Sequence, residues 1–380
     1  MKIVFTGGGS GGHIFPILAI VRAIKKEVLP PTKNLGLYYI GPDDKHGLKL
    51  LRQEGVKIKK IFCGKIRRYF SLENLLDLFK MPLGFIQSLF WLFFLAPDLV
   101  FSKGGFGSFP VAFMANVLSI PIFLHESDIE PGFASKVESK WVQEIFISFA
   151  QTTFFPKDKR IVVGNPIRKE ILNGSKEKAK EVFNLQGSKP LILILGGSQG
   201  AQKINETILE ILLEFLKDFE IIHQIGEKGF NQIKNEAEAI LFDKELKKFY
   251  HPFAFLNETF SKYALGASDL IVSRAGAGSI FEIAASAKPV ILIPLTSAAQ
   301  DHQRKNAYVF AEQGGGEVIE EINFNPHFFL AKLKHLFSRP DILENMAEKS
   351  LNFARPQAAK IIASYLVAYL MEIKQNGKEK

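Results

Sequence analysis

Short apolar runs alternate with helical patterns along most of the chain. In the first half, runs that predict strands lie at residues 2–5, 37–40, 99–102, 120–124, 144–148 and 160–163. A second series lies at residues 190–195, 221–224, 271–273 and 290–293. Strands that alternate with helices in this way are typical of βαβ units on a parallel sheet, so the pattern predicts an α/β protein.

Each series opens with an apolar strand and a glycine turn, KIVFTGGGSGG in the first and LILILGGSQGA in the second. After the second of these turns, apolar residues recur at helical spacing, namely Ile204, Ile208, Ile211, Leu212 and Phe215. A charged, turn-like segment at 164–189 separates the two series. We therefore expect two doubly wound, Rossmann-like domains that face a cleft. The helical pattern after Pro356 is expected to pack back across the first domain.

One apolar segment has two interpretations. Residues 81–101 read MPLGFIQSLFWLFFLAPDLVF, and the uninterrupted apolar part, Leu89–Ala96, is shorter than the roughly 20 residues that a membrane-spanning helix needs. The segment is either a buried helix or a helix whose apolar face dips into a bilayer. Three basic residues upstream would then lie near anionic lipid: Lys65, Arg67 and Arg68.

The composition narrows the class of protein. At 380 residues the chain is long enough for two domains, and its net charge of +9 favours anionic partners. Because no dense Lys/Arg run with interleaved aromatic residues occurs, we expect no nucleic-acid partner. The single cysteine, Cys63, excludes an internal disulfide. The start MKIVF, followed by glycine, predicts no signal peptide, and the cytosol is the expected compartment.

The first glycine turn, TGGGSGGHIFP at 6–16, fits the G-x-G-x-x-G pattern of dinucleotide-binding proteins. Such proteins place an acidic residue near the end of the second strand, where it binds the ribose. Here that strand ends at Gly41, and Asp43 and Asp44 follow only after Pro42. This weakens the NAD interpretation, and no cofactor is expected.

Further motifs occur in a fixed order along the chain. They are KGGFGSFP at 103–110, HE at 125–126, GNPIR at 164–168, GGSQGA at 196–201, SRAGAGSIFEIAASAKPVILIP at 273–294 and DHQRKNA at 301–307. Together with the opening turn, this set resembles the MurG family, the peptidoglycan N-acetylglucosaminyltransferases with the two-domain GT-B fold. The resemblance covers nearly the whole chain.

The resemblance implies an inverting hexosyltransferase. Its family moves GlcNAc from UDP-GlcNAc to the 4-hydroxyl of MurNAc in lipid I, the undecaprenyl-diphosphate-linked MurNAc-peptide, and so makes lipid II. It implies an acceptor- and lipid-binding domain at 1–163, joined by the last helix at 354–380, and a UDP-GlcNAc-binding domain at 164–353. It further implies peripheral attachment to the cytoplasmic face of the cell membrane, through residues around 81–96.

The resemblance also assigns residues to the acceptor and to catalysis. His13 is implied as the general base or as a ligand of the acceptor phosphate, and Glu126 as a catalytic residue or as one that orients a loop. The implied acceptor-binding residues are Ser10, Gly11, Gly12, His13, Gly104, Gly105, Phe106 and Asp128. The family usually has Gln-Asn where this chain has Ser127-Asp128, and an aspartate adds a charge and loses a donor.

The implied donor-binding residues are Arg168, Ser198, Gln199, Leu256, Ala277, Gly278, Glu282, His302 and Gln303. Several have alternative structural roles. Ser198 and Asp301 fit helix N-caps, and Arg168 fits a surface arginine. Ser279 and Glu282 have the spacing of a capping box, although a carboxylate at Glu282 also suits the two hydroxyls of a ribose. Where the family commonly has Asp, this chain has Gln300.

The sequence predicts no metal site, because it contains neither an Asp-x-Asp motif nor a Cys/His cluster with ligand spacing. A helix dipole with Arg168 can stabilise the leaving UDP instead. Three other functions remain open: another UDP-sugar glycosyltransferase of the GT-B fold, a UDP-GlcNAc 2-epimerase, and a non-catalytic nucleotide-binding membrane scaffold. The scaffold would have no need for His13 and Glu126.

Overall fold

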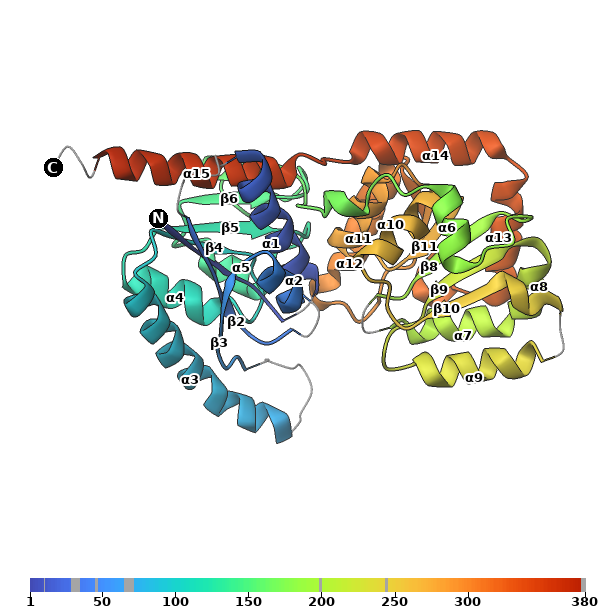
Figure 1. The fold of residues 1–380 in the computed structure, drawn as a ribbon, viewed down its shortest axis with the longest axis horizontal. Coiled ribbons are helices and arrows are strands. Elements are labelled where there is room, and N and C mark those ends of the chain that lie inside the picture. The colour runs from blue at the N-terminus through green and yellow to red at the C-terminus, as the bar shows by residue number, and fades with distance from the viewer. Residues whose placement is uncertain are drawn as a thin grey trace. The chain divides into compact units, whose positions relative to one another are not determined.

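The computed structural model describes residues 1–9, 11–28, 35–44, 47–64, 72–197, 200–242 and 245–376, with backbone alone for 72–80 and 376. The chain divides into two compact units, shown in Figure 1. We call Met1–Arg168 with Arg355–Lys380 the N-terminal unit, and Lys169–Ala354 the C-terminal unit. From the sequence alone, these boundaries are expected after residues 163 and 353.

The N-terminal unit is built on a parallel sheet. Among its described residues, seven strands lie in the order β3-β2-β1-β4-β5-β6-β7. Their bounds are β1 Lys2–Thr6, β2 Gly36–Gly41, β3 Lys57–Lys60, β4 Leu99–Ser102, β5 Ile122–Glu126, β6 Glu144–Ile147 and β7 Arg160–Val162. The helices are α1 Gly11–Ala23, which continues in a π-helical turn Ile24–Val28, α2 Gly47–Gln53, α3 Leu72–Leu95, α4 Phe109–Val117, α5 Phe133–Glu138 and α15 Ala358–Asn376.

The C-terminal unit repeats this plan with six strands among its described residues, in the order β10-β9-β8-β11-β12-β13 and all parallel. Their bounds are β8 Leu191–Leu195, β9 Glu220–Gln224, β10 Tyr250–Phe253, β11 Leu270–Ser273, β12 Val290–Leu292 and β13 Gly316–Val318. The helices are α6 Lys176–Phe183, α7 Gln202–Glu210, α8 Leu212–Asp218, α9 Phe230–Ile240, α10 Glu258–Ala267, α11 Ala277–Ala285, α12 His302–Glu312, α13 Pro326–Phe337 and α14 Pro340–Phe353. Short 3-10 turns lie at Lys169–Ile171, Glu245–Phe249, Ala299–Asp301 and Glu321–Asn323.

All ten strands that the apolar runs predict are present, with ends that differ by at most two residues. Three further strands, β3, β10 and β13, were not predicted. Each is an edge strand, with the sequences KIKK, YHPF and GEV. An edge strand is less enclosed by the sheet than a central one, and these three lack the apolar run that marks a strand buried on both faces.

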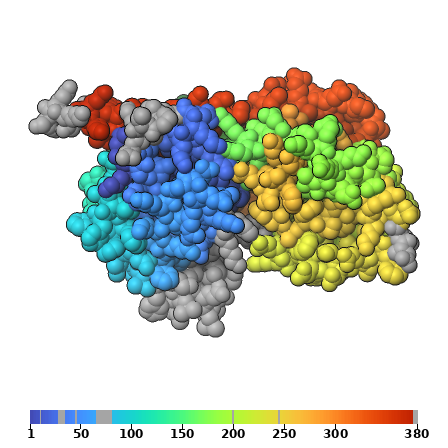
Figure 2. Space-filling model, in the orientation of Figure 1, coloured from blue at the N-terminus to red at the C-terminus, as the bar shows by residue number. Residues whose placement is uncertain are grey.

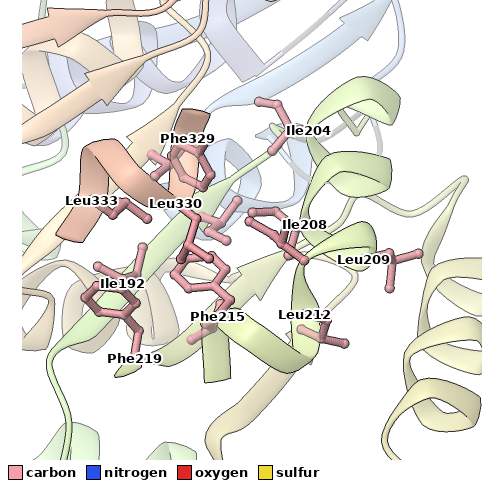
Figure 3. Packing of buried hydrophobic residues seen from close by; sticks show 14 of the residues in the cluster. Ile192, Ile204, Ile208, Leu209, Leu212, Phe215, Phe219, Phe329, Leu330 and Leu333 are labelled. Atoms are coloured by element: carbon pink, nitrogen blue, oxygen red, sulfur yellow. The ribbon is translucent and has the colours of Figure 1, made fainter. Parts of the chain in front are cut away.

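The predicted apolar helix face after the GGSQGA turn, residues 196–201, is buried, as Figure 3 shows. Ile208 and Phe215 pack with Ile192 of β8 and with Phe329 of α13. The pattern belongs to two helices instead of one, because α7 ends at Glu210 and α8 begins at Leu212.

The last helix belongs to the N-terminal unit. α15 packs on α1, where Ile362 and Leu366 share one apolar cluster with Ile17 and Leu18. The chain therefore returns to its first sheet after completing the second.

The segment at 81–95 forms the second part of α3, and its interpretation as a buried helix is wrong, because one of its sides is exposed. Gly84, Ser88 and Leu92 face the unit. On the other side, Ile86 is 63% exposed and Phe93 is 68% exposed. Leu83, Leu89, Phe90 and Phe94 are exposed as well. Figure 2 shows the light-blue and cyan part of the chain, which includes this helix, at the surface of the N-terminal unit.

Candidate active site

The carboxyl ends of three neighbouring strands bring two glycine turns and an acidic loop together in the N-terminal unit. β1 pairs with β4, and β4 pairs with β5. The first glycine turn, residues 7–12, follows β1, and the second, residues 103–108, follows β4. The amide of Gly8 donates to the carbonyl of Gly104 (3.0 Å), and the amide of Lys103 donates to that of Thr6 (2.8 Å). Two turns that are far apart in the sequence are thus hydrogen-bonded to each other.

His13 lies where these two glycine turns meet. It is in the first turn of α1, which Gly11 and Gly12 open. A Cβ added to Gly8 would stand 2.9 Å from the imidazole Nδ1, and one added to Gly105 would stand 2.7 Å from Nε2. Gly105 also has φ +87°, a conformation that favours glycine. The glycines therefore leave room for the ring.

The predicted acceptor-binding residues divide into those that gather around His13 and those that do not. Gly105 lies beside it, and Gly104 and Phe106 flank Gly105 in the same turn. Asp128 lies in the loop after β5, where its amide donates to Glu126. Ser10 lies outside the described residues.

Lys103 is a functional candidate that the sequence analysis missed, although it stands inside the KGGFGSFP motif. Its side chain is buried, and its Nζ donates to Ser127 Oγ at 2.6 Å. Ser127 donates in turn to Asn165 Oδ1 at 2.8 Å. Burial lowers the pKa of Lys103, while the carboxylates of Glu126 and Asp128 favour its charged form. The buried cation therefore neutralises part of the acidic loop.

Glu126 is the last residue of β5, and its carboxylate holds the loop that follows. Oε1 accepts from the amide of Asp128 (3.0 Å) and Oε2 from the amide of Gly132 (3.3 Å). Burial raises the pKa of Glu126, repulsion from Asp128 adds to this rise, and Lys103 opposes it. These contacts agree with the loop-orienting alternative, and a catalytic role for Glu126 stays a prediction.

His125, next to Glu126, has a structural environment. It is fully buried, and its Nε2 lies 3.0 Å from the carbonyl of Gly164. Burial lowers the pKa of His125 well below its usual value, so the ring is neutral and Nε2 carries the proton. The residue ties β5 to the segment after β7.

Arg168 belongs to the N-terminal unit and is not a surface arginine. Its guanidinium lies over the ring of Phe15 in α1, 4.2 Å from the ring centre, and the residue is 6% exposed. A cation over an aromatic face is a stabilising contact that fixes the guanidinium next to the helix that carries His13. Its expected action on the UDP phosphates stays a prediction.

In the C-terminal unit, the third glycine turn, residues 196–201, connects β8 to α7. The amide of Gly196 donates to the carbonyl of Gln224 (3.0 Å), which anchors the start of the turn to β9. Ala201 stands at the N-cap of α7, with no side-chain cap. Ser198 and Gln199 lie outside the described residues.

The capping box predicted at Ser279 and Glu282 is wrong. α11 begins at Ala277, its N-cap is Gly276, and both predicted residues lie inside the helix. The prediction failed because it assumed a side-chain cap, whereas the helix start has a glycine without one. The first amides of α11, including those of Ala277 and Gly278, therefore receive no side-chain acceptor from the N-cap.

The start of α12 has an unusual backbone. Gln300 and Asp301 have φ +55° and +58°. Asp301 stands at the N-cap without a side-chain cap and instead pairs with Arg304 (2.7 Å). His302 Nδ1 lies 2.6 Å from the carbonyl of Ala299, and Gln303 Oε1 accepts from the amide of Leu295 (3.0 Å). Gln303 thus fixes the loop before the helix.

Leu256 and Arg274 make further contacts that order loops of the C-terminal unit. Leu256 donates its amide to Gln224 Oε1 (3.2 Å) and accepts at its carbonyl from Ser261, so its contact to uracil stays a prediction. Arg274, a residue of the SRAGAGS motif with no predicted role, pairs with Glu321. Glu321 also accepts from Thr296, so this ion pair joins the end of β11 to the loop after β12.

The described residues contain neither a candidate metal cluster nor a candidate membrane-spanning helix. Within the described ranges, no group of three or more His, Cys, Asp or Glu side chains is placed to hold a metal ion. No helix in the described part of the chain has both the length and the apolar character to cross a membrane.

Comparisons with known proteins agree with the two-unit organisation. Residues 3–147 match the glycosyltransferase family 28 N-terminal domain, and residues 191–362 match the C-terminal domain of the same family. The chain is similar to the UDP-N-acetylglucosamine–N-acetylmuramyl-(pentapeptide) pyrophosphoryl-undecaprenol N-acetylglucosamine transferase of Treponema denticola, with 35% identity over 97% of both chains. It is 36% identical to the enzyme of the same name from Clostridium tetani, over 96% of this chain and 98% of the relative.

Solved structures share the fold. The crystal structure of Acinetobacter baumannii MurG has a TM-score of 0.69 and 23% identity, covering 96% of this chain and 98% of that one. UDP-GlcNAc 2-epimerase from Neisseria meningitidis has a TM-score of 0.68 and 16% identity, covering 97% of this chain and 100% of that one. At these identities, both likenesses show the fold alone.

Proposed function

Because the chain belongs to glycosyltransferase family 28 and, within it, to the UDP-N-acetylglucosamine–N-acetylmuramyl-(pentapeptide) pyrophosphoryl-undecaprenol N-acetylglucosamine transferases, we propose that it moves GlcNAc from UDP-GlcNAc to lipid I. The product is lipid II, formed with inversion at the anomeric carbon. Within the molecule, the main support for this proposal is the position of His13 between two glycine turns that are hydrogen-bonded to each other.

His13 acts as the general base in this proposal. The 4-hydroxyl of MurNAc forms the new bond to the anomeric carbon while the bond from that carbon to UDP breaks. His13 takes the hydroxyl proton as the bond forms, a contribution of about 10²–10⁴-fold in rate. A neutral imidazole is required, and histidine titrates in the physiological range.

The acceptor diphosphate is assigned to the amides of the first two glycine turns. Backbone amides at the start of a helix suit anions, and the glycines allow phosphate oxygens to approach the backbone. The buried cation of Lys103 adds positive charge behind this surface.

The donor is assigned to the C-terminal unit. The third glycine turn and the start of α7 suit a diphosphate, and the carboxylate of Glu282 suits the ribose hydroxyls. The N-cap of α11 is Gly276, which has no side chain to accept from the first amides of the helix. These amides are further donors for the donor substrate. Stabilisation of the leaving UDP by these dipoles predicts a reaction that does not require a metal ion.

Residues 83–94 of α3 support a position at the cytoplasmic face of the membrane. The exposed apolar residues recur at spacings of three and four, which places them on one helix side: Leu83, Ile86, Phe90, Phe93 and Phe94. The adjacent edge strand β3 carries three lysines, and Lys59 Nζ lies 4.1 Å from the ring centre of Trp91. Apolar side chains beside lysines suit a surface of anionic lipid. The predicted upstream cations Lys65, Arg67 and Arg68 lie outside the described residues.

The decisive experiment is UDP release from UDP-GlcNAc, with and without a lipid I analogue, and with UDP-glucose and UDP-GalNAc as controls. Release that requires the lipid acceptor and prefers UDP-GlcNAc is expected. Release without acceptor would point to hydrolysis or to epimerase chemistry. Binding of UDP-GlcNAc without release would favour the non-catalytic scaffold. His13→Ala is expected to bind UDP-GlcNAc normally and to turn over slowly.

A further inference from the structure

A buried carboxyl lies directly beneath the second glycine turn. Glu138, the last residue of α5, is fully buried. Ser102 Oγ at the end of β4 lies 2.5 Å from its Oε2, and Ser108 Oγ at the N-cap of α4 lies 2.6 Å from its Oε1. Glu138 therefore bridges the two ends of the turn that carries Gly104 and Gly105.

Each serine has another contact in the same turn. Ser102 Oγ accepts from the amide of Gly104 at 3.1 Å, and its own proton goes to Glu138. Ser108 Oγ lies 2.9 Å from the carbonyl of Gly105 as well as 2.6 Å from Glu138 Oε1. The carbonyl and an ionised carboxylate can only accept, and a serine hydroxyl has a single proton.

Counting protons shows which state of Glu138 satisfies all these contacts. If Glu138 is ionised, the one proton of Ser108 serves either the carboxylate or the carbonyl of Gly105. The carboxylate is the stronger acceptor because it is charged, so Gly105 loses this donor. If Oε1 carries a proton, it donates to Ser108 Oγ, and Ser108 donates to Gly105. The complete network thus requires one proton on Glu138.

The surroundings of Glu138 favour that proton. Burial raises the pKa of Glu138 to about 7, against the opposite effect of the Ser102 and Ser108 hydroxyls. Glu126 on β5 faces it and repels a second negative charge. α4 carries no titratable side chain.

Two nearby lysines have their ammonium groups on partners other than Glu138. Lys103, next to Ser102 in the chain, donates to Ser127. Lys136 on α5 pairs with Glu130 at 2.6 Å. Cys63 Sγ lies 3.8 Å from the carbonyl of Gly107 in the same turn, and burial raises the pKa of this thiol to about 12, so it keeps its proton at neutral pH. The imidazole of His13 lies against Gly105.

We propose that Glu138 is a positioning residue, which holds the second glycine turn against His13 while its carboxyl carries a proton and loosens the turn when the proton leaves. The titration acts on Gly105, whose position sets the space for the His13 imidazole. The effect on turnover rests on the proposed function. The effect on the turn itself does not.

Three variants separate the states. In Glu138→Gln, the amide nitrogen donates to Ser108 and the amide oxygen accepts from Ser102, which imitates the protonated carboxyl at every pH. In Ser108→Ala, Gly105 lacks the hydroxyl donor at every pH. Glu220→Gln replaces a buried glutamate of the C-terminal unit and serves as the matched control, because the lowered pKa of Glu220 keeps it ionised above pH 6.

The first measurement is hydrogen exchange of residues 102–112 in the full chain at pH 6.0 and pH 8.5, corrected for the intrinsic pH dependence of exchange. In the wild type and in Glu220→Gln, protection of the turn should fall by about three- to tenfold at the higher pH, the factor of one hydrogen bond. Glu138→Gln should keep its protection at both pH values, and Ser108→Ala should show the lowered protection at both, since the backbone amide of residue 108 still donates to Gly105 (3.1 Å). Equal pH responses in the wild type and Glu138→Gln would overturn the proposal.

The second measurement is kcat/KM from pH 6 to 8.5. The ratio of wild type to Glu138→Gln should fall with rising pH by about three- to tenfold, and Glu220→Gln should follow the wild type. A constant ratio together with a pH-dependent turn would show that the turn titrates without affecting His13, which overturns the positioning role. If the chain releases no UDP at all, the hydrogen-exchange result still decides whether Glu138 controls the turn.

Discussion

The imidazole of His13 lies against the backbone of Gly105, so closely that a Cβ at residue 105 would stand 2.7 Å from Nε2. Gly105→Ala should therefore displace the ring, and the positive φ at this residue adds a cost of about 1–2 kcal/mol for any other side chain. We expect kcat to fall by at least about tenfold while the Kd of UDP-GlcNAc stays the same, because a 1 Å displacement near reacting atoms has large effects on rate. Steady-state kinetics and calorimetric titration measure the two quantities.

Gly132→Ala is the matched control for this substitution. Gly132 belongs to the same edge of the sheet, has φ −64°, and a Cβ there would have no neighbour within 4 Å. It should keep the wild-type kcat. A Gly105→Ala variant as active as Gly132→Ala would mean that the position of His13 does not control turnover.

Lys103 is expected to stabilise the N-terminal unit through charge. Lys103→Met removes the cation and leaves the buried Glu126 next to the half-buried Asp128 without a positive charge, so the unfolding free energy should fall by about 3–5 kcal/mol. Adding Asp128→Asn should restore part of this loss. Chemical denaturation followed by tryptophan fluorescence measures it, since both tryptophans, Trp91 and Trp141, lie in the N-terminal unit.

Lys136→Met tests whether any lost ion pair has this effect. Lys136 pairs with Glu130, and both side chains are about a quarter exposed, so this variant should lose at most about 1 kcal/mol. If Asp128→Asn changes stability by the same amount with and without Lys103, the two charges are not coupled and the explanation fails.

The pattern of the sequence was sufficient to predict the central strands but not the contacts that order the site. Apart from Lys2 at the start of β1, the strands β1, β4 and β5 are buried, and a strand enclosed on both faces has a near-continuous apolar run. The role of Lys103 depends on Ser127 and Asn165, which reach it only after the parallel strands have aligned. The spacing of residues along the sequence does not indicate such a contact.

The same limit explains why the capping box at Glu282 was predicted wrongly and why Glu138 was not recognised. A serine followed three residues later by glutamate is the spacing of a capping box, but α11 begins two residues before Ser279, with Gly276 as its N-cap. Glu138 gave no signal because its two serines lie 36 and 30 residues away in the sequence. A single buried glutamate at the end of a short helix resembles any solvated one until its partners are known.

Glu282 is expected to bind the ribose of the donor. Glu282→Gln should weaken UDP binding by about tenfold or more, since a hydrogen bond to a charged group contributes about 1.5–3 kcal/mol. It should leave the binding of 2′,3′-dideoxyuridine diphosphate unchanged, because that ligand lacks both hydroxyls. Glu312→Gln, at an exposed residue of α12, is the control. If Glu282→Gln lowers the affinity for both nucleotides equally, Glu282 does not bind the ribose hydroxyls.

The exposed side of α3 is expected to carry membrane affinity. Replacement of Phe90, Phe93 and Phe94 by serine should lower binding to vesicles of anionic lipid by about tenfold or more, because apolar burial stabilises by about 25 cal/mol per Å². Affinity for UDP should not change. The control variant replaces three exposed apolar residues of the C-terminal unit with serine: Phe242, Ile322 and Phe328. If the α3 variant binds vesicles as tightly as the wild type, this helix does not contact the membrane.

The proton on Glu138 also predicts how stability depends on pH. In the unfolded chain the carboxyl loses its proton near pH 4.5, whereas in the folded chain the pKa is about 7. Between these values the folded state binds one more proton than the unfolded state, so stability falls as pH rises, by about 1.4 kcal/mol per pH unit and about 3 kcal/mol in all. Above pH 7 and below pH 4.5 this contribution no longer changes.

Glu138→Gln has no proton to lose, so the difference in unfolding free energy between it and the wild type isolates this contribution. That difference should change by about 3 kcal/mol between pH 4.5 and pH 7.5, in the direction that favours the variant at the higher pH. Tryptophan fluorescence is a sensitive probe, because the amide of Trp141 donates to the carbonyl of Glu138 itself (2.9 Å). A difference that is constant over this range would mean that Glu138 is ionised in the folded protein, and the turn would then be held without its proton.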